Sequence, residues 1–375
     1  MLVAAALALV LAGSLVYCVL TVIAARRYLA VRPPAATRMP PISVLKPLSG
    51  ADLGLEENLR TFFLQDYPDY ELLFAVREAD DPAAAIVERL RREFPSVAAR
   101  LIVTGEPPYA NAKVWSLSMM WAAARHDLVV MSDSDIRVTA RLLRTIAAEF
   151  DDPAVGLATC PYRAVPGQSF WSALEAVGMN TEFLGGVLTA RMMEGMKFAL
   201  GPTIAVRRQA LDGIGGWNSL MDYLAEDFVM GNRVAASGYV VLLSSYVIEH
   251  HIGATGFVEN WRHRLRWARS TRRSRPKGYL GQVFTNPLPL ALLICTLRPD
   301  LWLLLPVTAV FRVAAAFATA GWVLRDRLTL RMWWSVPLQD IYSFVVWLGG
   351  FVGNTILWRG RRYYLRPDGR FELVR

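Results

Sequence analysis

Residues 128–135 have the sequence LVVMSDSD, an apolar run that ends in two alternate acids, Asp133 and Asp135. Branched and long apolar side chains favour a buried strand at 128–131, and the polar residues after it mark the carboxyl end of that strand. In an open α/β sheet, ligands bind beyond the carboxyl ends of the strands. Alternate carboxylates at such an end can hold a hard divalent cation, which can bridge a diphosphate. The alternative is a solvated turn that caps the following helix.

Short apolar runs alternate with helical patterns on both sides of this stretch, from residue 38 to about residue 243. Strands are predicted at 42–45, 70–76, 101–104, 128–131 and 155–159, and helices at 55–64, 81–93, 112–124 and 139–150. Such an alternation predicts a mainly parallel sheet that is covered by helices on both faces. We therefore expect an α/β fold of the Rossmann-like class.

Further acids stand at comparable places in the pattern. Asp81 follows the strand predicted at 70–76, where it could simply cap the next helix. Glu226 and Asp227 open another helical pattern. A buried carboxylate near a metal-bound diphosphate can act as a general base on an acceptor hydroxyl. Acids at a helix N-terminus are also favoured by the helix dipole alone, so both interpretations are kept.

A basic segment follows the predicted α/β region. Residues 262–277 contain seven Arg, one Lys and no acid. Arg266 could bind a diphosphate with a bidentate fork, and Trp267 could form a wall of an acceptor pocket. A basic amphipathic helix at a membrane interface explains the same pattern. Because an apolar region begins at residue 287, we expect most of the other arginines to face anionic lipid headgroups rather than nucleic acid.

Three other side chains are candidates for a nucleotide or metal site. Lys113 could reach a donor phosphate, although a single Lys in a loop is usually solvated. His250 and His251 could each offer an imidazole ligand to a metal. The three cysteines of the chain lack metal-ligand spacing, which fits a reducing compartment without a disulfide framework.

The hydrophobic content of 54% is high for a soluble protein. Residues 2–25 carry no charge and are long enough to cross ~30 Å of hydrocarbon as a helix. Arg26, Arg27, Arg32 and Arg38 follow, so we expect an uncleaved anchor at 1–25 with the next domain in the cytoplasm. Apolar stretches return at 287–358, and 359–375 is expected to be a basic cytoplasmic tail of a multi-pass chain. Two or three spans, a re-entrant hairpin and an interfacial helix are all compatible with these stretches.

Several of these motifs, taken in order, resemble the ceramide glucosyltransferase group. They are Lys46-Pro47-Leu48-Ser49-Gly50, Asp80-Asp81-Pro82, Asp133-Ser134-Asp135-Ile136-Arg137-Val138, Ala225-Glu226-Asp227 and Arg266-Trp267. That group is a branch of the family 2-like inverting glycosyltransferases with the GT-A fold, and the resemblance extends over nearly the whole chain. It implies a GT-A domain at 38–279. The hopanoid-associated glycosyltransferase is similar too, in residues 263–269 and 286–290.

The resemblance also implies roles for individual residues. Asp81 would contact the uridine, Asp133 and Asp135 would hold Mg²⁺ or Mn²⁺ on the diphosphate, and Asp227 would be the base. The donor and acceptor site would be completed by Arg266 and Trp267. Independently of the resemblance, Lys113, Glu226 and His263 are further candidate substrate-binding residues. His263 departs from the group, which usually carries Gln three residues before the Arg-Trp pair. This departure weakens a processive polysaccharide-synthase interpretation and leaves the role of His263 open.

The expected reaction is inverting transfer of a hexose from a UDP-sugar to the hydroxyl of a membrane lipid, with glucose and ceramide as the first choice. One alternative is transfer of N-acetylglucosamine to a hopanoid polyol. An alternative of another class is a basic membrane-surface binding protein without catalysis. No nucleic-acid partner is expected.

Overall fold

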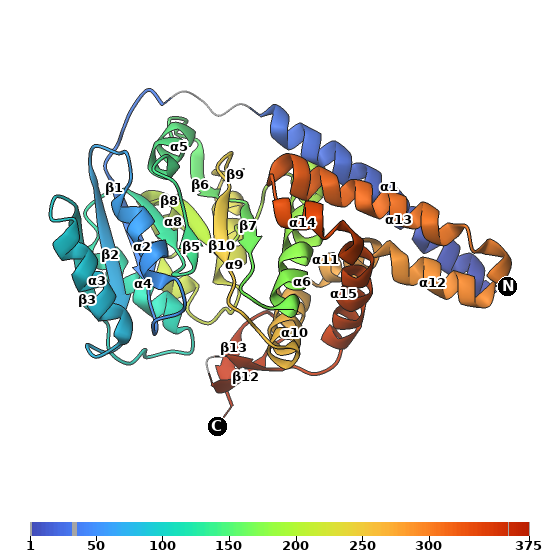
Figure 1. The fold of residues 1–375 in the computed structure, drawn as a ribbon. Helices are drawn as coiled ribbons and strands as arrows, with labels where there is room; N and C mark the ends of the chain where they lie inside the picture. The colour runs from blue at the N-terminus through green and yellow to red at the C-terminus, as the bar shows by residue number, and fades with distance from the viewer. Residues whose placement is uncertain (1, 32–35, 359, 375) are drawn as a thin grey trace.

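The computed structural model describes residues 2–31, 36–358 and 360–374. An α/β domain forms one part of the molecule, and a group of helices extends away from it, as Figure 1 shows. The predicted fold class is therefore confirmed. Met1 and Arg32 of the expected anchor region, and Arg359 and Arg375 of the expected tail, lie outside the described residues.

A seven-stranded sheet runs through the described part of the α/β domain. In spatial order its strands are β3 (Ala98–Val103), β2 (Tyr70–Val76), β1 (Ile42–Pro47), β4 (Leu128–Ser132), β8 (Thr203–Arg207), β6 (Val155–Thr159) and β9 (Val240–Leu243). The sheet is mainly parallel, but β8 runs antiparallel to both of its neighbours, β4 and β6. The residues just before β8 therefore reach the same edge of the sheet as the residues just after β4.

Helices cover both faces of this sheet. One face packs against α2 (Leu55–Phe63), α3 (Pro82–Glu93) and α5 (Leu142–Glu149). The other packs against α4 (Ala112–Ala123), α8 (Arg208–Gly213), the short helix η2 (Trp217–Ser219) and α9 (Glu226–Ala236). Neighbouring strand residues serve opposite faces: Val44 belongs to the first core and Leu45 to the second. This alternation is the expected pattern for a doubly covered sheet.

A second, three-stranded sheet continues from the end of β4. It pairs β10 (Ile248–His251) with β5 (Ile136–Arg137) on one side and with β7 (Tyr162–Val165) on the other. The pairing aligns His250 with Ile136, next in sequence to Asp135. After β7 the chain forms α6 (Phe170–Gly178), the π-helix η1 (Met179–Phe183) and α7 (Leu184–Glu194).

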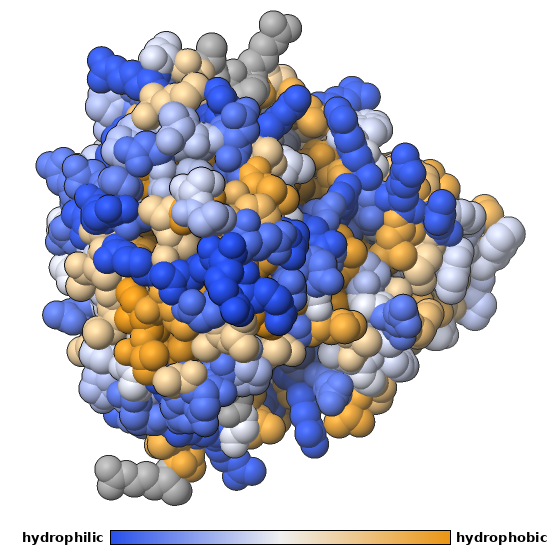
Figure 2. Space-filling view, turned by 60° about the vertical axis from the view of Figure 1, so that its left-hand side comes forward, coloured by the Kyte–Doolittle hydropathy of each residue, from blue (hydrophilic) through white to orange (hydrophobic). Residues whose placement is uncertain are grey.

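Two described helices, Leu2–Ala30 and Leu304–Val323, are long and apolar enough to cross a membrane. The first is α1, which continues five residues beyond the expected end at residue 25 and docks on the α/β domain, where Tyr28 Oη donates to Ser244 O. The second comprises α13 (Leu304–Ala316) and the π-helix η5 (Phe317–Val323). In Figure 2 hydrophobic side chains line the protruding part at the right, whereas charged side chains crowd the α/β domain.

Further helices follow in the C-terminal half of the chain. They are α10 (Phe257–Ser274), α11 (Pro276–Gly281), η3 (Gln282–Phe284), α12 (Pro287–Leu297), η4 (Pro299–Leu301), α14 (Arg327–Arg331), η6 (Trp333–Ser335) and α15 (Val336–Gly350). One of them, α12, packs against α1 and α13. The bent pair Pro276–Phe284 and Pro287–Leu297 would be a third span if its two parts cross together, with a bend of 55°. The apolar stretch that begins at 341 is instead α15, 15 residues long, followed by a turn and a strand. At ~1.5 Å per residue α15 is too short to cross ~30 Å of hydrocarbon.

The segment expected to be a basic tail is folded. β11 (Thr355–Trp358), β12 (Arg361–Leu365) and β13 (Phe371–Leu373) form a third sheet, named here the C-terminal sheet. Its apolar side packs against Ala110 and Leu224 of the α/β domain, and Phe371 N–H donates to Asp222 O over 2.9 Å. Alternating apolar residues inside the basic sequence, such as Tyr363 and Leu365, form this core.

Most of the α10 arginines that we expected to face lipid headgroups have partners within the chain. Arg269 and Arg272 donate to backbone carbonyl oxygens in residues 351–355, and Arg272 and Arg273 both donate to Asn354 Oδ1. Arg275 pairs with Glu194. These arginines are therefore partnered within the chain, and Arg269, Arg272 and Arg273 join α10 to the turn after α15. The Arg262 side chain is exposed.

Candidate active site

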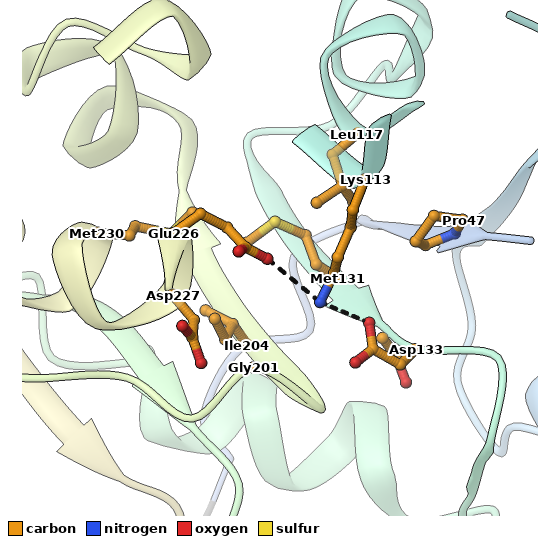
Figure 3. Close-up of a pocket in the computed structure, with 11 residues that line it drawn as sticks. Pro47, Lys113, Leu117, Met131, Asp133, Gly201, Ile204, Glu226, Asp227 and Met230 are labelled. Carbon is orange, nitrogen blue, oxygen red and sulfur yellow. Dashed lines mark ion pairs between the residues drawn. The ribbon is translucent and has the colours of Figure 1, made fainter. Parts of the chain in front are cut away.

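A small pocket lies at the edge of the large sheet where β1 and β4 end. It is lined by Pro47 at the end of β1, by Asp133 just after β4 and by Gly201 just before β8, together with side chains of α4 and α9. Figure 3 shows Lys113, Asp133, Glu226 and Asp227 around this pocket. The reversed direction of β8 is what brings Gly201 to the same edge as Asp133.

Lys113 joins the acids of two separate elements. Its Nζ lies 2.7 Å from Asp133 Oδ1 and 3.4 Å from Glu226 Oε1. Asn111 places the lysine by capping α4: its side chain accepts from Val114 N–H and donates to Tyr223 O. Burial opposes the charge of Lys113, but Asp133, Glu226 and Asp227 together raise its pKa well above the usual value. Lys113 is thus a fixed cation in the pocket and not a solvated loop residue.

Glu226 and Asp227 begin α9 and both line the pocket. Burial raises the pKa of Glu226 to about 7, although Lys113 opposes the shift. Burial likewise raises the pKa of Asp227, against Lys113 and the backbone N–H groups of Phe228 and Gly201. A methyl group at Gly201 would lie 2.8 Å from Asp227 Oδ2, so the glycine leaves room for this carboxylate. Acids with raised pKa values are suited to proton transfer near neutral pH.

Beside the pocket, buried His250 pairs with Asp135, which is half-buried. His250 Nε2 lies 3.0 Å from Asp135 Oδ2, whereas Asp135 Oδ1 is buried and has no hydrogen-bond partner within the described part of the chain. Burial would raise the pKa of Asp135, but His250 and Lys46 hold it below the usual value. His250 therefore orients Asp135 through a hydrogen bond and is not itself placed as a metal ligand. His251 is paired with Glu249 instead.

Lys46 is a site residue that the sequence reasoning did not single out, although it belongs to the first resembling motif. It is fully buried at the end of β1, where its ammonium donates to Asp133 O and Ser132 Oγ and lies 3.9 Å from the centroid of the Phe62 ring. Burial lowers the pKa of Lys46 to about 7, although Asp133 and Asp135 oppose the shift. A lysine directly after the strand predicted at 42–45 and directly before a proline was the available signal.

Asp133 and Asp135 offer carboxylate oxygens for a cation at the edge of the sheet. Among residues 2–31, 36–358 and 360–374, no group of three or more His, Cys, Asp or Glu side chains could hold a metal. Two carboxylates are nevertheless enough for Mg²⁺ that takes its remaining oxygens from water and substrate phosphate. The buried Oδ1 atom of Asp135, which has no partner among the described residues, fits such a role. Asp133 already attracts positive charge, since it pairs with the ammonium of Lys113. The donor set is hard oxygen, which suits Mg²⁺ or Mn²⁺.

Asp81 caps α3, as one of the two interpretations predicted. Its carboxylate accepts from Ala83 N–H and Gly50 N–H, so it also fixes the turn after β1. The carboxylate has further lone pairs available for a ligand. The structure therefore confirms the cap and does not test the predicted contact with uridine.

His263, Arg266 and Trp267 lie on α10. His263 Nδ1 is 2.8 Å from Glu175 Oε1, a buried acid on α6, and its ring lies 5.0 Å from that of Trp267. Trp267 packs against the main core of the α/β domain, and Arg266 is half-buried. Glu175 is a second residue that sequence reasoning missed, because nothing in a lone acid of an apolar helix indicates its partner.

Comparison with known proteins decides the family. The model of glycosyl transferase family 21 matches residues 6–371. The chain belongs to that family. The relatives of this family 21 chain include ceramide glucosyltransferase 1 of Caenorhabditis elegans, 29% identical over 56% of this chain and 45% of the relative. They also include the beta-monoglucosyldiacylglycerol synthase of Synechocystis, which is 26% identical over 54% of this chain and 42% of the relative.

The family 21 chain therefore spans less than half the length of these curated relatives. Among solved structures, it is similar to a mannosyltransferase from Pyrobaculum calidifontis in complex with GDP-Man and Mn²⁺. The TM-score is 0.54 at 21% sequence identity, over 92% of this chain and 98% of the other. This likeness confirms the GT-A fold. Family membership argues against the alternative of a membrane-surface protein without catalysis.

Proposed function

We propose that this glycosyltransferase moves a hexose from a UDP-sugar to the hydroxyl of a membrane lipid with inversion at the anomeric carbon, and that glucose and ceramide are its substrates. The proposal is carried by the pocket that gathers Lys113, Asp133, Glu226 and Asp227 at the carboxyl edge of the sheet. The relatives support the lipid acceptor, because both are named for transfer of glucose to a lipid.

Asp227 is the proposed base. Its carboxylate takes the proton of the acceptor hydroxyl while the hydroxyl oxygen forms a bond to the anomeric carbon of the donor. The bond between that carbon and the diphosphate oxygen breaks in line, so UDP departs from the opposite face and the configuration inverts. The backbone N–H groups of Phe228 and Gly201, and the lack of a side chain at Gly201, keep the Asp227 carboxylate in place.

Positive charge for the diphosphate comes from the chain itself and from a cation. Lys113 and Arg266 are the proposed side-chain partners of the diphosphate, with Asp81 on the uridine. Asp133 and Asp135 would hold Mg²⁺ or Mn²⁺, which supplies neutralisation of the charge that develops on the leaving diphosphate. The mannosyltransferase with the similar fold contains Mn²⁺ with its nucleotide sugar, which supports this assignment.

The proposed location is a membrane, crossed by α1 and by the helix Leu304–Val323, with the α/β domain on the cytoplasmic side. Arg26 and Arg27 at the domain end of α1 support this orientation through the positive-inside rule. A lipid acceptor and its enzyme would then share the same leaflet.

The test is a transfer assay with the purified full chain in lipid nanodiscs. UDP-glucose, UDP-N-acetylglucosamine and GDP-mannose are each offered with ceramide, diacylglycerol or a hopanoid polyol, and products are identified by mass spectrometry. A hexosylceramide formed from UDP-glucose is the expected product. If the product is instead a glycosylated hopanoid or a glycosylated diacylglycerol, that lipid and not ceramide is the acceptor. The absence of any glycolipid product would refute the proposal.

A further inference from the structure

Five aromatic side chains from three helices lie together near the start of α10. They are Phe170 and Trp171 of α6, Phe257 and Trp261 of α10 and Tyr342 of α15, named here the aromatic cluster. The Trp171 and Phe257 rings are 4.7 Å apart, and both lie about 6 Å from the Tyr342 ring, measured between centroids. The cluster is therefore continuous across α6, α10 and α15.

The outer rings of the cluster are not covered by other protein. Phe170 and Phe257 are 45% and 46% exposed, and the neighbouring Val258 is 55% exposed. Apolar rings grouped at a surface indicate a binding surface for something apolar, whereas single exposed apolar residues are common.

Helix α15, which carries Tyr342, indicates what kind of surface surrounds the aromatic cluster. The buried residues of α15 include three polar ones, Gln339, Asp340 and Ser343, beside Val336 and Val346, whereas its exposed side carries only apolar residues, Leu338, Ile341, Val345 and Leu348, at helical spacing. A helix whose exposed side is apolar while polar side chains are buried beneath it is arranged for contact with hydrocarbon and not with water. Because Tyr342 lies on this helix, the aromatic cluster adjoins a surface suited to lipid.

On its inner side the cluster is connected to His263. Tyr342 Oη donates to Asn260 Oδ1 over 2.8 Å, and Asn260 Nδ2 donates to Glu175 Oε2 over 2.6 Å. The other oxygen of Glu175 holds His263 Nδ1. Because Glu175 fixes one nitrogen of the imidazole, the other nitrogen has a defined direction.

From His263 a row of aromatic rings leads to the pair formed by Asp135 and His250. The rings of His263 and Trp267 are followed by Phe183, 6.4 Å from Trp267, and by Tyr162, 5.2 Å from Phe183. Tyr162 lies 5.4 Å from His250, which holds Asp135. The exposed cluster and the candidate cation site are thus the two ends of one connected row of side chains.

We propose that the aromatic cluster binds the hydrocarbon chain of the lipid acceptor and that the polar end of this lipid lies at His263 and Trp267. The proposal rests on the proposed function, because it requires a lipid acceptor. Flat aromatic rings offer a large apolar area to an acyl chain, and the hydrogen bonds of Asn260, Glu175 and His263 begin where the chain would end. The cluster therefore selects the acceptor by its hydrocarbon chain, separately from donor binding in the pocket.

A chain-length comparison tests the kinetic consequence. Phe257→Ala is compared with wild type on a long-chain and a short-chain ceramide, with UDP-glucose as donor. The KM for the long-chain ceramide should rise about tenfold, the scale expected when the contact of one aromatic ring is lost, whereas the KM values for short-chain ceramide and UDP-glucose stay the same. Trp333→Ala is the matched control, because Trp333 on η6 is 51% exposed and lies outside the cluster. An equal effect on both ceramides, or the same effect from Trp333→Ala, would overturn the proposal.

Photolabelling provides a readout that does not depend on transfer. A ceramide with a diazirine in its acyl chain should label peptides containing residues 170–171 and 257–261, and unlabelled ceramide should compete. Phosphatidylcholine with the same diazirine chain should label these peptides less. Equal labelling by both lipids, or labelling confined to α1 and α13, would contradict an acceptor site. If wild type labels specifically at the cluster but forms no glycolipid, the proposed function fails while the lipid site stands.

Discussion

Lys113 Nζ lies 2.7 Å from Asp133 Oδ1, so the first acid of the alternate pair already has a cationic partner from α4. Replacing this lysine by the uncharged Lys113→Met leaves Asp133, Glu226 and Asp227 without a counter-charge. The free energy of unfolding should fall by about 1–3 kcal/mol, and the KM for the donor should rise. Thermal melting and donor titration measure the two effects. Lys113→Arg keeps the charge and should retain most of the stability. If Lys113→Met melts at the same temperature as wild type, the pairing does not contribute to stability.

Removal of divalent cations should stop transfer. EDTA is expected to abolish activity, and Mg²⁺ or Mn²⁺ should restore it. Calorimetry adds a readout without turnover: Mn²⁺ should tighten UDP binding to wild type but not to Asp135→Asn. Asp127→Asn serves as the control, because the Asp127 side chain is 96% exposed. Full activity in chelator would refute the cation assignment.

The two acids of α9 should differ in their effect on turnover. Asp227→Asn is expected to lower kcat by ~10²-fold or more, the scale of general base catalysis, with UDP binding nearly intact. Because the base acts without its proton and burial raises the pKa of Asp227, turnover should decline as the pH falls through that raised pKa. If Glu226→Gln is the inactive variant instead, Glu226 is the base.

A methyl group at position 201 should displace the Asp227 carboxylate. The added carbon would lie 2.8 Å from Asp227 Oδ2, a contact too close to be tolerated without movement. Gly201→Ala is therefore expected to fold and to lose kcat with a smaller change in donor affinity. Gly213→Ala is the matched control, since no atom lies within 4 Å of its added carbon. Equal kcat in both variants would show that this carboxylate tolerates displacement.

The arginines of α10 should contribute to stability more than to lipid attachment. Arg272 donates to Gly353 O and Asn354 Oδ1, so Arg272→Ala removes several internal hydrogen bonds and should lower the melting temperature at low and high salt alike. Exposed Arg262→Ala should leave the melting temperature unchanged. Melting in detergent measures the contribution to stability, and vesicle flotation measures attachment to lipid. A salt-sensitive loss of vesicle binding by Arg272→Ala would show that Arg272 faces lipid.

Much of the α/β domain could be predicted because its local patterns are strong. The strands at 70–76 and 155–159 have the predicted bounds, since buried apolar runs ended by polar residues leave little ambiguity. The direction of β8 could not be predicted, because an apolar strand has the same pattern in either direction. Only the three-dimensional pairing of β8 with β4 brings Gly201 beside Asp227.

Within the site, sequence identified the acids but not their partners. Asp133, Asp135, Glu226 and Asp227 lie in recognisable positions, whereas the pairing of Lys113 with Glu226 and of His250 with Asp135 joins residues distant in sequence. The C-terminal sheet was predicted as a tail because its arginines dominate the composition. Its alternating Tyr363 and Leu365 were the overlooked signal for a strand.

The C-terminal sheet also links the site to the order of protein synthesis. Phe371 binds the backbone at Asp222, a few residues before Glu226, and this strand is translated after both candidate spans. Domains form from the N-terminal side while the ribosome is still working. A nascent chain that has emerged only as far as α13 contains each proposed catalytic acid but lacks the strand that fixes their loop. The contact that Phe371 makes with the loop before Glu226 can therefore form only after both candidate spans have been translated.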